Sequence, residues 1–152
     1  MHSDARGFTL VELIVVLGIM AIVSMVALPR YAGAMARYRA DAAARRIAAD
    51  LTLAQAEARQ ASQSRRFRVS VGSNRYYLLD SKALDDPSKT YTVILGEAPY
   101  HAVITSASFN GSQTVTFNGF GKPDAGGTMV ISVGSLQRTI SVDGGSGKVT
   151  VQ

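Results

Sequence analysis

Residues 6–30 read RGFTLVELIVVLGIMAIVSMVALPR, and this stretch determines how the rest of the chain is interpreted. From Phe8 to Leu28 there are 21 residues, and the only charged side chain among them is Glu12. As an α-helix rising ~1.5 Å per residue, this run is about 31 Å long, close to the ~30 Å hydrocarbon thickness of a bilayer. We therefore predict a helix that spans a membrane once, over residues 8–28.

Two other interpretations of the apolar run are a cleaved secretory signal peptide and a helix buried in a soluble core. A secretory signal has a basic start and small residues at its cleavage site. Arg6 is the only basic residue before the run, Asp4 offsets it, and the small triplet at residues 32–34 lies beyond Pro29. The remaining residues are too few to surround a buried helix of this length. A membrane anchor is therefore favoured over both.

Glu12 is the unusual residue of the run. A carboxylate inside hydrocarbon costs about 2–3 kcal/mol or more unless it finds a partner, so it marks a functional site by default. The alternative is that Glu12, about one turn into the run, reaches back to the membrane interface. That alternative explains why the residue is tolerated but not why these particular residues surround it.

The hexapeptide Gly7-Phe8-Thr9-Leu10-Val11-Glu12 and the apolar helix after it resemble the class III signal of type IV prepilins and type II secretion pseudopilins. The resemblance implies that a prepilin peptidase removes residues 1–7 as a leader by cutting between Gly7 and Phe8. It also implies that the new N-terminus, Phe8, is methylated. Pro29 then stands where many pilins carry a proline.

The same resemblance implies a role for Glu12 in assembly. The mature amino group of Phe8 is a cation in the membrane, and Glu12 is an anion about one turn away. When subunits stack, the carboxylate of one can pair with the amine of its neighbour, so that both charges are compensated. The expected partners are other pilins, which bind through the N-terminal helix, together with the prepilin peptidase and the inner membrane.

The net charge of +5 is concentrated in residues 30–68, which hold nine arginines against three acidic residues. By the positive-inside rule, the arginines that follow the apolar run would place the C-terminal part in the cytoplasm. The prepilin-like signal implies the opposite orientation, with a periplasmic C-terminal domain. The charge rule is statistical and the signal is specific, so we expect a single-pass inner-membrane protein that enters a pilus or pseudopilus when assembled.

Residues 29–64 are predicted to continue the helix with an amphipathic pattern. Small and aliphatic residues recur at spacings of three and four: Ala40, Ala43, Ala44, Ile47, Leu51, Ala54, Ala58 and Ala61. Charged residues, Asp50 among them, occupy much of the remaining surface. Proline removes a backbone donor, so Pro29 is expected to kink the helix without ending it. One helix over roughly residues 9–63 results.

From residue 65 the pattern changes to a period of two, which indicates β-strands. Candidate strands are RYYLLD (75–80), KTYTVIL (89–95), YHAVIT (100–105), QTVTF (113–117), TMVISV (128–133), QRTISVD (137–143) and KVTV (148–151), after a first strand around Phe67 and Val69. Turn-forming residues separate most of them. A long helix followed by short antiparallel strands predicts an α+β, pilin-like fold in which the helix packs on a sheet.

The stretch TVTFNGFGKPDAGGTMVISV (114–133) and the final hairpin ending in Gly-Lys-Val resemble the GspH/FimT minor pseudopilins. This resemblance implies a structural subunit of a type II secretion pseudopilus or a type IV pilus. Some FimT-like members bind DNA during uptake through a Gly-Arg-x-Arg run. Here the matching residues are Gly147-Lys148-Val149-Thr150, so both arginines are replaced.

Arg65, Arg66, Arg68 and Lys148 are the candidate contacts for nucleic acid or lipid. Clustered basic residues can bind phosphates, which supports a DNA-binding minor pilin as the alternative function. The more ordinary interpretation is that these side chains solvate an exposed face, touch anionic lipid headgroups, or pair with acidic neighbours.

The residues offer little for catalysis. The two histidines are His2 in the leader and His101 in a predicted strand, and the chain has no cysteine. No metal-ligand motif, nucleophile–base pair or phosphate-binding loop is recognisable. Asp85, Asp86 and Asp143 stand beside turn residues, where carboxylates commonly cap the backbone, although some pseudopilins hold calcium at such places. We expect no enzyme activity, no cofactor and no metal.

Overall fold

The computed structural model describes residues 8–83 and 86–152. The chain divides into two compact units, Met1–Met35 and Ala36–Gln152. A single helix, α1 (Leu10–Ala61), begins in the first unit and ends in the second. The two units are described separately below.

The predicted buried face of α1 is present in the second unit. Ala40, Ala43, Ala44, Ile47, Leu51, Ala54 and Ala58 are all buried, and only Ala61 of the predicted set is exposed. Because most of these side chains are alanine, the helix backbone can lie close to the strands beneath it. The spacing of the apolar residues therefore predicted the buried face of α1 correctly.

The helix ends two residues earlier than predicted, at Ala61. The Ser62 N–H donates to the Arg59 carbonyl at 3.3 Å, and the Gln63 N–H donates to the Ala58 carbonyl at 3.2 Å. Ser62 has a φ of 49°, in the left-handed region. This pair of hydrogen bonds around a left-handed residue is a Schellman motif, which satisfies the last carbonyls and stops the helix.

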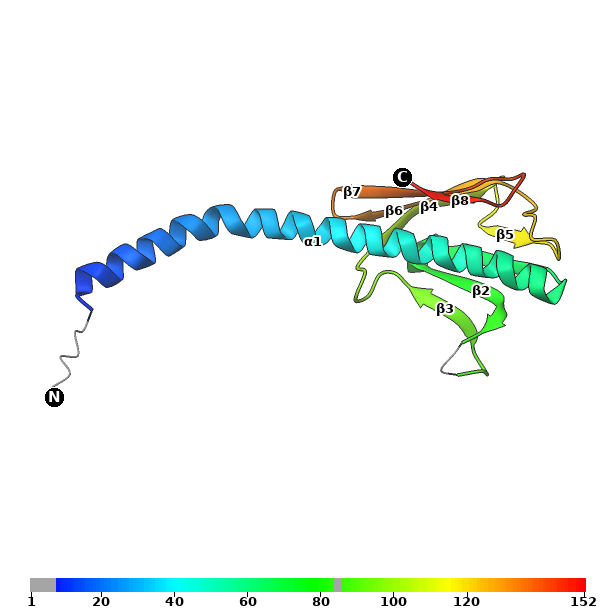
Figure 1. Ribbon diagram of the computed structural model, residues 1–152, viewed down its shortest axis with the longest axis horizontal. Helices are drawn as coiled ribbons and strands as arrows, with labels where there is room; N and C mark the ends of the chain where they lie inside the picture. Colours follow the sequence, from blue (N-terminus) through cyan, green and yellow to red (C-terminus); the bar gives the residue numbers. More distant parts are fainter. Residues whose placement is uncertain (1–7, 84–85) are drawn as a thin grey trace. The chain divides into compact units, whose positions relative to one another are not determined.

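Eight strands follow and form two antiparallel sheets. They are β1 (Arg65–Ser70), β2 (Arg75–Lys82), β3 (Thr90–Ile94), β4 (Val103–Phe109), β5 (Thr114–Phe117), β6 (Gly127–Val133), β7 (Leu136–Val142) and β8 (Val149–Val151). Sheet A has the strand order β3-β2-β1-β5, and sheet B has the order β4-β6-β7-β8. Figure 1 shows the part of α1 in unit Ala36–Gln152 running alongside these strands, as the predicted α+β fold requires.

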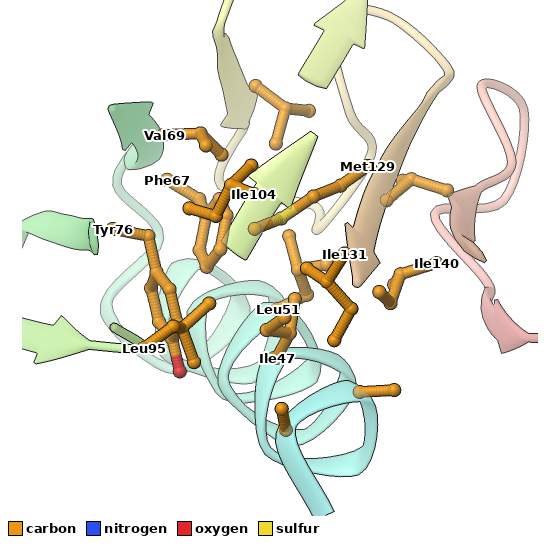
Figure 2. Close-up of a cluster of buried hydrophobic side chains, with 14 of the residues drawn as sticks. Ile47, Leu51, Phe67, Val69, Tyr76, Leu95, Ile104, Met129, Ile131 and Ile140 are labelled. Carbon is orange, nitrogen blue, oxygen red and sulfur yellow. The ribbon is translucent and has the colours of Figure 1, made fainter. Parts of the chain in front are cut away.

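One hydrophobic core joins the helix to both sheets. Figure 2 shows Ile47 and Leu51 of α1 pointing between side chains of sheet A on one side and of sheet B on the other. The labelled side chains beside them are Phe67, Val69 and Tyr76 from sheet A, Ile104, Met129, Ile131 and Ile140 from sheet B, and Leu95, which directly follows β3. The rings of Phe67 and Tyr76 stack with their centroids 4.9 Å apart.

The fourth strand lies later in the chain than predicted, and the placement of His101 in a strand was wrong. His101 has a φ of 49° and is exposed, and its N–H donates to the Glu97 carbonyl in a turn. β4 instead runs on to Phe109, with a register shift between Ile104 and Ser106. An inserted residue in a strand breaks the alternation of buried and exposed side chains, so the predicted strand ended too early in the sequence.

Candidate functional site

The apolar N-terminal segment, residues 8–34, is the first candidate site. Every side chain described in it is exposed, including Phe8 at 82%. Among the described residues, α1 is the helix long and apolar enough to cross a membrane, with its apolar window near the N-terminus. An apolar surface this large marks a membrane or protein contact, because water does not solvate it favourably.

Glu12 stands at the start of this helix. Its backbone N–H donates a hydrogen bond to the Thr9 Oγ1 at 3.2 Å, so the Thr9 side chain caps the helix. Thr9 and Glu12 thus occupy the N-cap and third positions of a Thr-x-x-Glu pattern, in which a carboxylate also faces the positive end of the helix dipole. The sequence analysis missed this local role, although the spacing Thr9-x-x-Glu12 signals it.

Two other predicted residues of this segment have different outcomes. Gly7, on the leader side of the predicted cleavage, lies outside the described residues. α1 continues through Pro29, so the proline does not end the helix. The kink at Pro29 stays a prediction.

The predicted basic contacts fall on both sheets. Arg65, Arg66 and Arg68 belong to β1 in sheet A, whereas Lys148 directly precedes β8 in sheet B. The Arg65 Nε is buried and lies 3.9 Å from Glu57 Oε2, beyond hydrogen-bond distance. These four residues therefore do not form one continuous strip along a single strand.

Arg66 is engaged by a carboxylate from the neighbouring strand. Its Nη2 donates to Asp80 Oδ1 at 2.7 Å, its Nε donates to Asp80 Oδ2 at 3.1 Å, and its backbone N–H donates to the same Oδ2 at 2.9 Å. The hydrogen bonds from the Arg66 side chain lower the pKa of Asp80 below its ordinary range. A two-pronged pair of this kind leaves Arg66 poorly placed to bind a phosphate.

Arg68 lines an open groove of about 700 Å³ on the face of sheet A that points away from the core. The groove also contains Tyr77, Thr92 and Lys89. Lys89 Nζ lies 3.0 Å from Asp86 Oδ2, so one of the two cations is already paired. Among its described lining residues, the groove is mildly basic and lacks the run of unpaired cations typical of nucleic-acid surfaces.

Asp50 is a buried carboxylate whose surroundings the sequence analysis did not foresee. It is 5% exposed, so its placement on the polar side of the helix was wrong. Its Oδ2 accepts hydrogen bonds from the Tyr76 hydroxyl at 2.6 Å, the Tyr91 hydroxyl at 3.1 Å and the Arg46 Nε at 3.1 Å. Asp50 lies three residues after Ile47 and four before Ala54, a spacing that already put it on the buried face.

The electrostatics of this cluster follow from burial. Burial, and then the Asp50 carboxylate, raise the pKa of Tyr76 and likewise that of Tyr91, so both hydroxyls stay protonated and donate. Figure 2 shows the Tyr76 hydroxyl oxygen directed toward the helix. The Asp50 cluster (Arg46, Asp50, Tyr76 and Tyr91) therefore fastens α1 to β2 and β3.

The aspartates considered for calcium act as turn caps. Asp143 Oδ1 accepts hydrogen bonds from the N–H and hydroxyl of Ser146, both at 2.7 Å, and these bonds lower the pKa of Asp143. Asp86 Oδ1 binds the N–H and hydroxyl of Ser88, while Asp85 lies outside the described residues. Within residues 8–83 and 86–152, no three His, Cys, Asp or Glu side chains gather as metal ligands.

Comparison with known proteins places the chain in a family. The model of the family described as type II transport protein GspH matches residues 43–147. The chain belongs to the GspH family. A second family model, the prokaryotic N-terminal methylation motif, matches residues 2–28. No curated protein matches the chain.

Among solved structures, the type IV minor pilin FimU of Pseudomonas aeruginosa (strain PAO1) is similar to this chain at 16% sequence identity. The match covers 74% of this chain and 91% of FimU, with a TM-score of 0.49. The GspH match and the methylation motif identify a minor pseudopilin or pilin, a structural subunit that assembles with other pilins and carries a prepilin-type N-terminus.

Proposed function

We propose that this GspH-family protein is a single-pass inner-membrane subunit of a type II secretion pseudopilus or a type IV pilus. Residues 1–7 are the leader, 8–28 the membrane helix, 29–64 its amphipathic continuation and 65–152 a periplasmic β-domain. The observation that supports this division is the contrast between the exposed apolar segment and the buried core after residue 36. The protein acts by assembling and has no catalytic role.

Processing is the first step of the proposed function. A prepilin peptidase cuts between Gly7 and Phe8, and the new amino group of Phe8 is methylated. Phe8 is exposed and immediately precedes the Thr9 cap, so the residue that would become the new N-terminus stands before the helix.

Intact-mass measurement after coexpression with a prepilin peptidase tests this step. We expect a mature chain that begins at methylated Phe8. Gly7→Val should block processing because the added bulk stands at the scissile position, whereas Gly7→Ala should still be cut, but poorly. A wild-type chain that keeps Met1, or one cut after Ala34, would contradict the proposal.

Glu12 is the proposed assembly residue. It is four residues after Phe8, so its carboxylate follows closely on the amine of the proposed mature N-terminus. In a stack of subunits it pairs with the amine of a neighbour, which compensates both charges in the apolar surroundings. The capping geometry at Thr9 holds this end of the helix in one conformation for that contact.

A DNA-binding role is less well supported by the described side chains. Arg66 is paired with Asp80, Arg65 faces Glu57, and Lys89 is paired with Asp86. Binding of duplex DNA by phosphate contacts would be steeply weakened by salt. We expect the purified full chain to show no such salt-sensitive binding, as measured by fluorescence anisotropy between low and physiological salt.

A further inference from the structure

Phe120 is the most exposed large hydrophobic side chain described in unit Ala36–Gln152, at 89%. Single exposed hydrophobic residues are common on protein surfaces, so exposure alone has no functional meaning. Phe120 differs from most single exposed hydrophobic residues because several hydrogen bonds hold its loop, residues 118–122, in place.

The loop is first closed on itself through Asn118. The Asn118 Oδ1 accepts hydrogen bonds from the backbone N–H groups of Phe120 and Lys122, both at 3.0 Å. The Asn118 carbonyl accepts from the Gly121 N–H at 2.7 Å, and the Asn118 N–H donates to the Lys122 carbonyl at 2.9 Å. The loop backbone is therefore fixed independently of any partner.

The loop is also fastened to the end of α1, which lies beside it in Figure 1. Arg59 Nε donates to the Phe120 carbonyl at 3.2 Å, and the buried Gln55 Nε2 donates to the Gly121 carbonyl at 2.8 Å. A side chain at Gly119 would come within 2.8 Å of the Ser62 backbone, so glycine permits this close approach. A rigid loop that presents an aromatic ring loses little conformational entropy on binding.

The loop lies at the end of the folded unit that is remote from Ala36, where the N-terminal unit joins. Arg59 is 23 residues after Ala36 in α1, which corresponds to about 35 Å along the helix axis. The ring is therefore presented at the end of this unit opposite the chain's entry into it.

The charges beside Phe120 indicate the kind of surface that it fits. Arg59, whose Nε donates to the Phe120 carbonyl, and Lys122, two residues after Phe120, are both exposed. The nearest carboxylate in sequence, Asp124, is turned onto β5, where its Oδ1 accepts from the Thr116 N–H at 2.9 Å. A loop that exposes an aromatic ring together with cations is complementary to an apolar pocket with an acidic rim.

We propose that Phe120 is the anchor through which this subunit docks onto the globular part of a different pilin in the same assembly. The partner offers an apolar pocket rimmed by carboxylates. A second copy of this chain fits less well, because Arg68 lines one surface groove and the Asp80 carboxylate in another is paired with Arg66. Single-stranded DNA also fits less well, since stacking surfaces for bases use several aromatic rings along a basic groove.

This inference rests on the proposed function, so its test scores assembly separately. In cells that produce all the pilins of the machine, the photo-crosslinking amino acid p-benzoylphenylalanine replaces Phe120 in the full-length chain. The matched control places it at Val103, which is 51% exposed on β4. We expect irradiation to join position 120, but not position 103, to one other pilin, identified by mass spectrometry.

A substitution gives the energetic readout. Phe120→Ala should reduce recovery of that pilin with the full-length protein by about 30-fold, the loss typical of a buried aromatic anchor. Phe120→Trp should retain it, and Val103→Ala should leave it unchanged. The thermal midpoint of Phe120→Ala should equal that of wild type, because the side chain is exposed.

Each other outcome is decisive. A processed chain that is recovered with the other pilins but forms no adduct at position 120 overturns the inference and leaves the proposed function standing. An adduct with a second copy of this chain, with a protein outside the pilin family, or with nuclease-sensitive material also overturns it. A chain that never joins the other pilins overturns both.

Discussion

Two carboxylates on α1, Glu12 and Asp50, have opposite surroundings. Asp50 is buried and accepts hydrogen bonds from Arg46, Tyr76 and Tyr91 within the same chain. The described contact of Glu12 is local: its backbone N–H donates to the Thr9 hydroxyl, and the large apolar residues next to it in sequence are exposed. The fold compensates the Asp50 carboxylate, whereas we propose that a neighbouring subunit compensates that of Glu12.

The apolar side chains of the chain are likewise arranged in two different ways. In unit Ala36–Gln152 the apolar side chains of the helix and both sheets meet in one core. In residues 8–34 every described side chain faces outward. The core of unit Ala36–Gln152 buries its apolar side chains within one chain. Those of residues 8–34 can leave water only in a bilayer or against other helices.

The largest effect is expected for the replacement of Glu12, which should reduce assembly. Alone in a bilayer, Glu12→Ala removes a cost of ~2 kcal/mol, so insertion and processing should be normal. In the assembly it leaves a neighbour's amine unpaired, a penalty of ~3–5 kcal/mol. The assembled fraction should fall by more than ~100-fold, as measured by crosslinking to the other pilins.

Glu12→Gln is the matched control for this change. The amide can still accept a hydrogen bond from the amine, so assembly should fall less than it does with alanine. A glutamate that merely reaches the membrane interface predicts the opposite order, with alanine assembling at least as well as wild type. That result would refute the pairing role.

The next prediction compares how two leucines of α1, one buried and one exposed, contribute to the free energy of unfolding. Leu51 is fully buried, whereas Leu17 is 57% exposed. Leu51→Ala should lower the free energy of unfolding by ~2–5 kcal/mol, because it removes buried methyl groups and leaves a cavity. Leu17→Ala should leave it unchanged. Urea unfolding of the full chain in mild detergent, followed by tyrosine fluorescence, measures both, and equal losses would contradict the division into two units.

A smaller effect is expected at Asp50. Asp50→Ala removes the acceptor of Tyr76 and leaves that buried hydroxyl without its partner, at a cost of ~1–3 kcal/mol. Asp50→Asn keeps an acceptor oxygen of the same shape and should lose less. Ultraviolet absorbance of the tyrosines on unfolding provides the measurement, and a neutral Asp50→Ala would mean that the cluster does not fasten the helix.

The sequence allowed much of this fold to be predicted because its patterns are local. Spacings of three and four located the buried face of α1, and alternation located the strands near Phe67, Met129 and Ile140. Each of these signals depends only on which side of an element its residues occupy. The N-terminal hexapeptide was equally readable, because its meaning comes from a short contiguous stretch.

The parts that could not be predicted depend on contacts between distant residues. The two tyrosine partners of Asp50 are 26 and 41 residues away in sequence, so the spacing on the helix placed it near the core but could not name them. Likewise, the pairing of Arg66 with Asp80 arises from the register of β1 against β2. β4 was misplaced because its register shift near Thr105 interrupts the alternation.

The smallest effect concerns the surface pair Arg66–Asp80, the exposed counterpart of the Asp50 cluster. Hydrogen bonds from the Arg66 side chain hold the pKa of Asp80 below its ordinary value of 3.8. Because the folded-state pKa is the lower one, the pair stabilises the fold fully above pH 3.8 and loses its contribution as the pH falls through the folded-state value.

Asp80→Asn isolates this contribution, since Asp86 and Asp143, whose pKa values are also lowered, titrate in both proteins. At pH 7 the variant should melt slightly below wild type, and the difference should shrink once the pH is brought well below 3.8. The effect is small because exposed pairs are screened by water, and added salt should reduce it further at pH 7. A melting difference that is the same at both pH values would mean that the Asp80 carboxylate contributes through its shape and not through its charge.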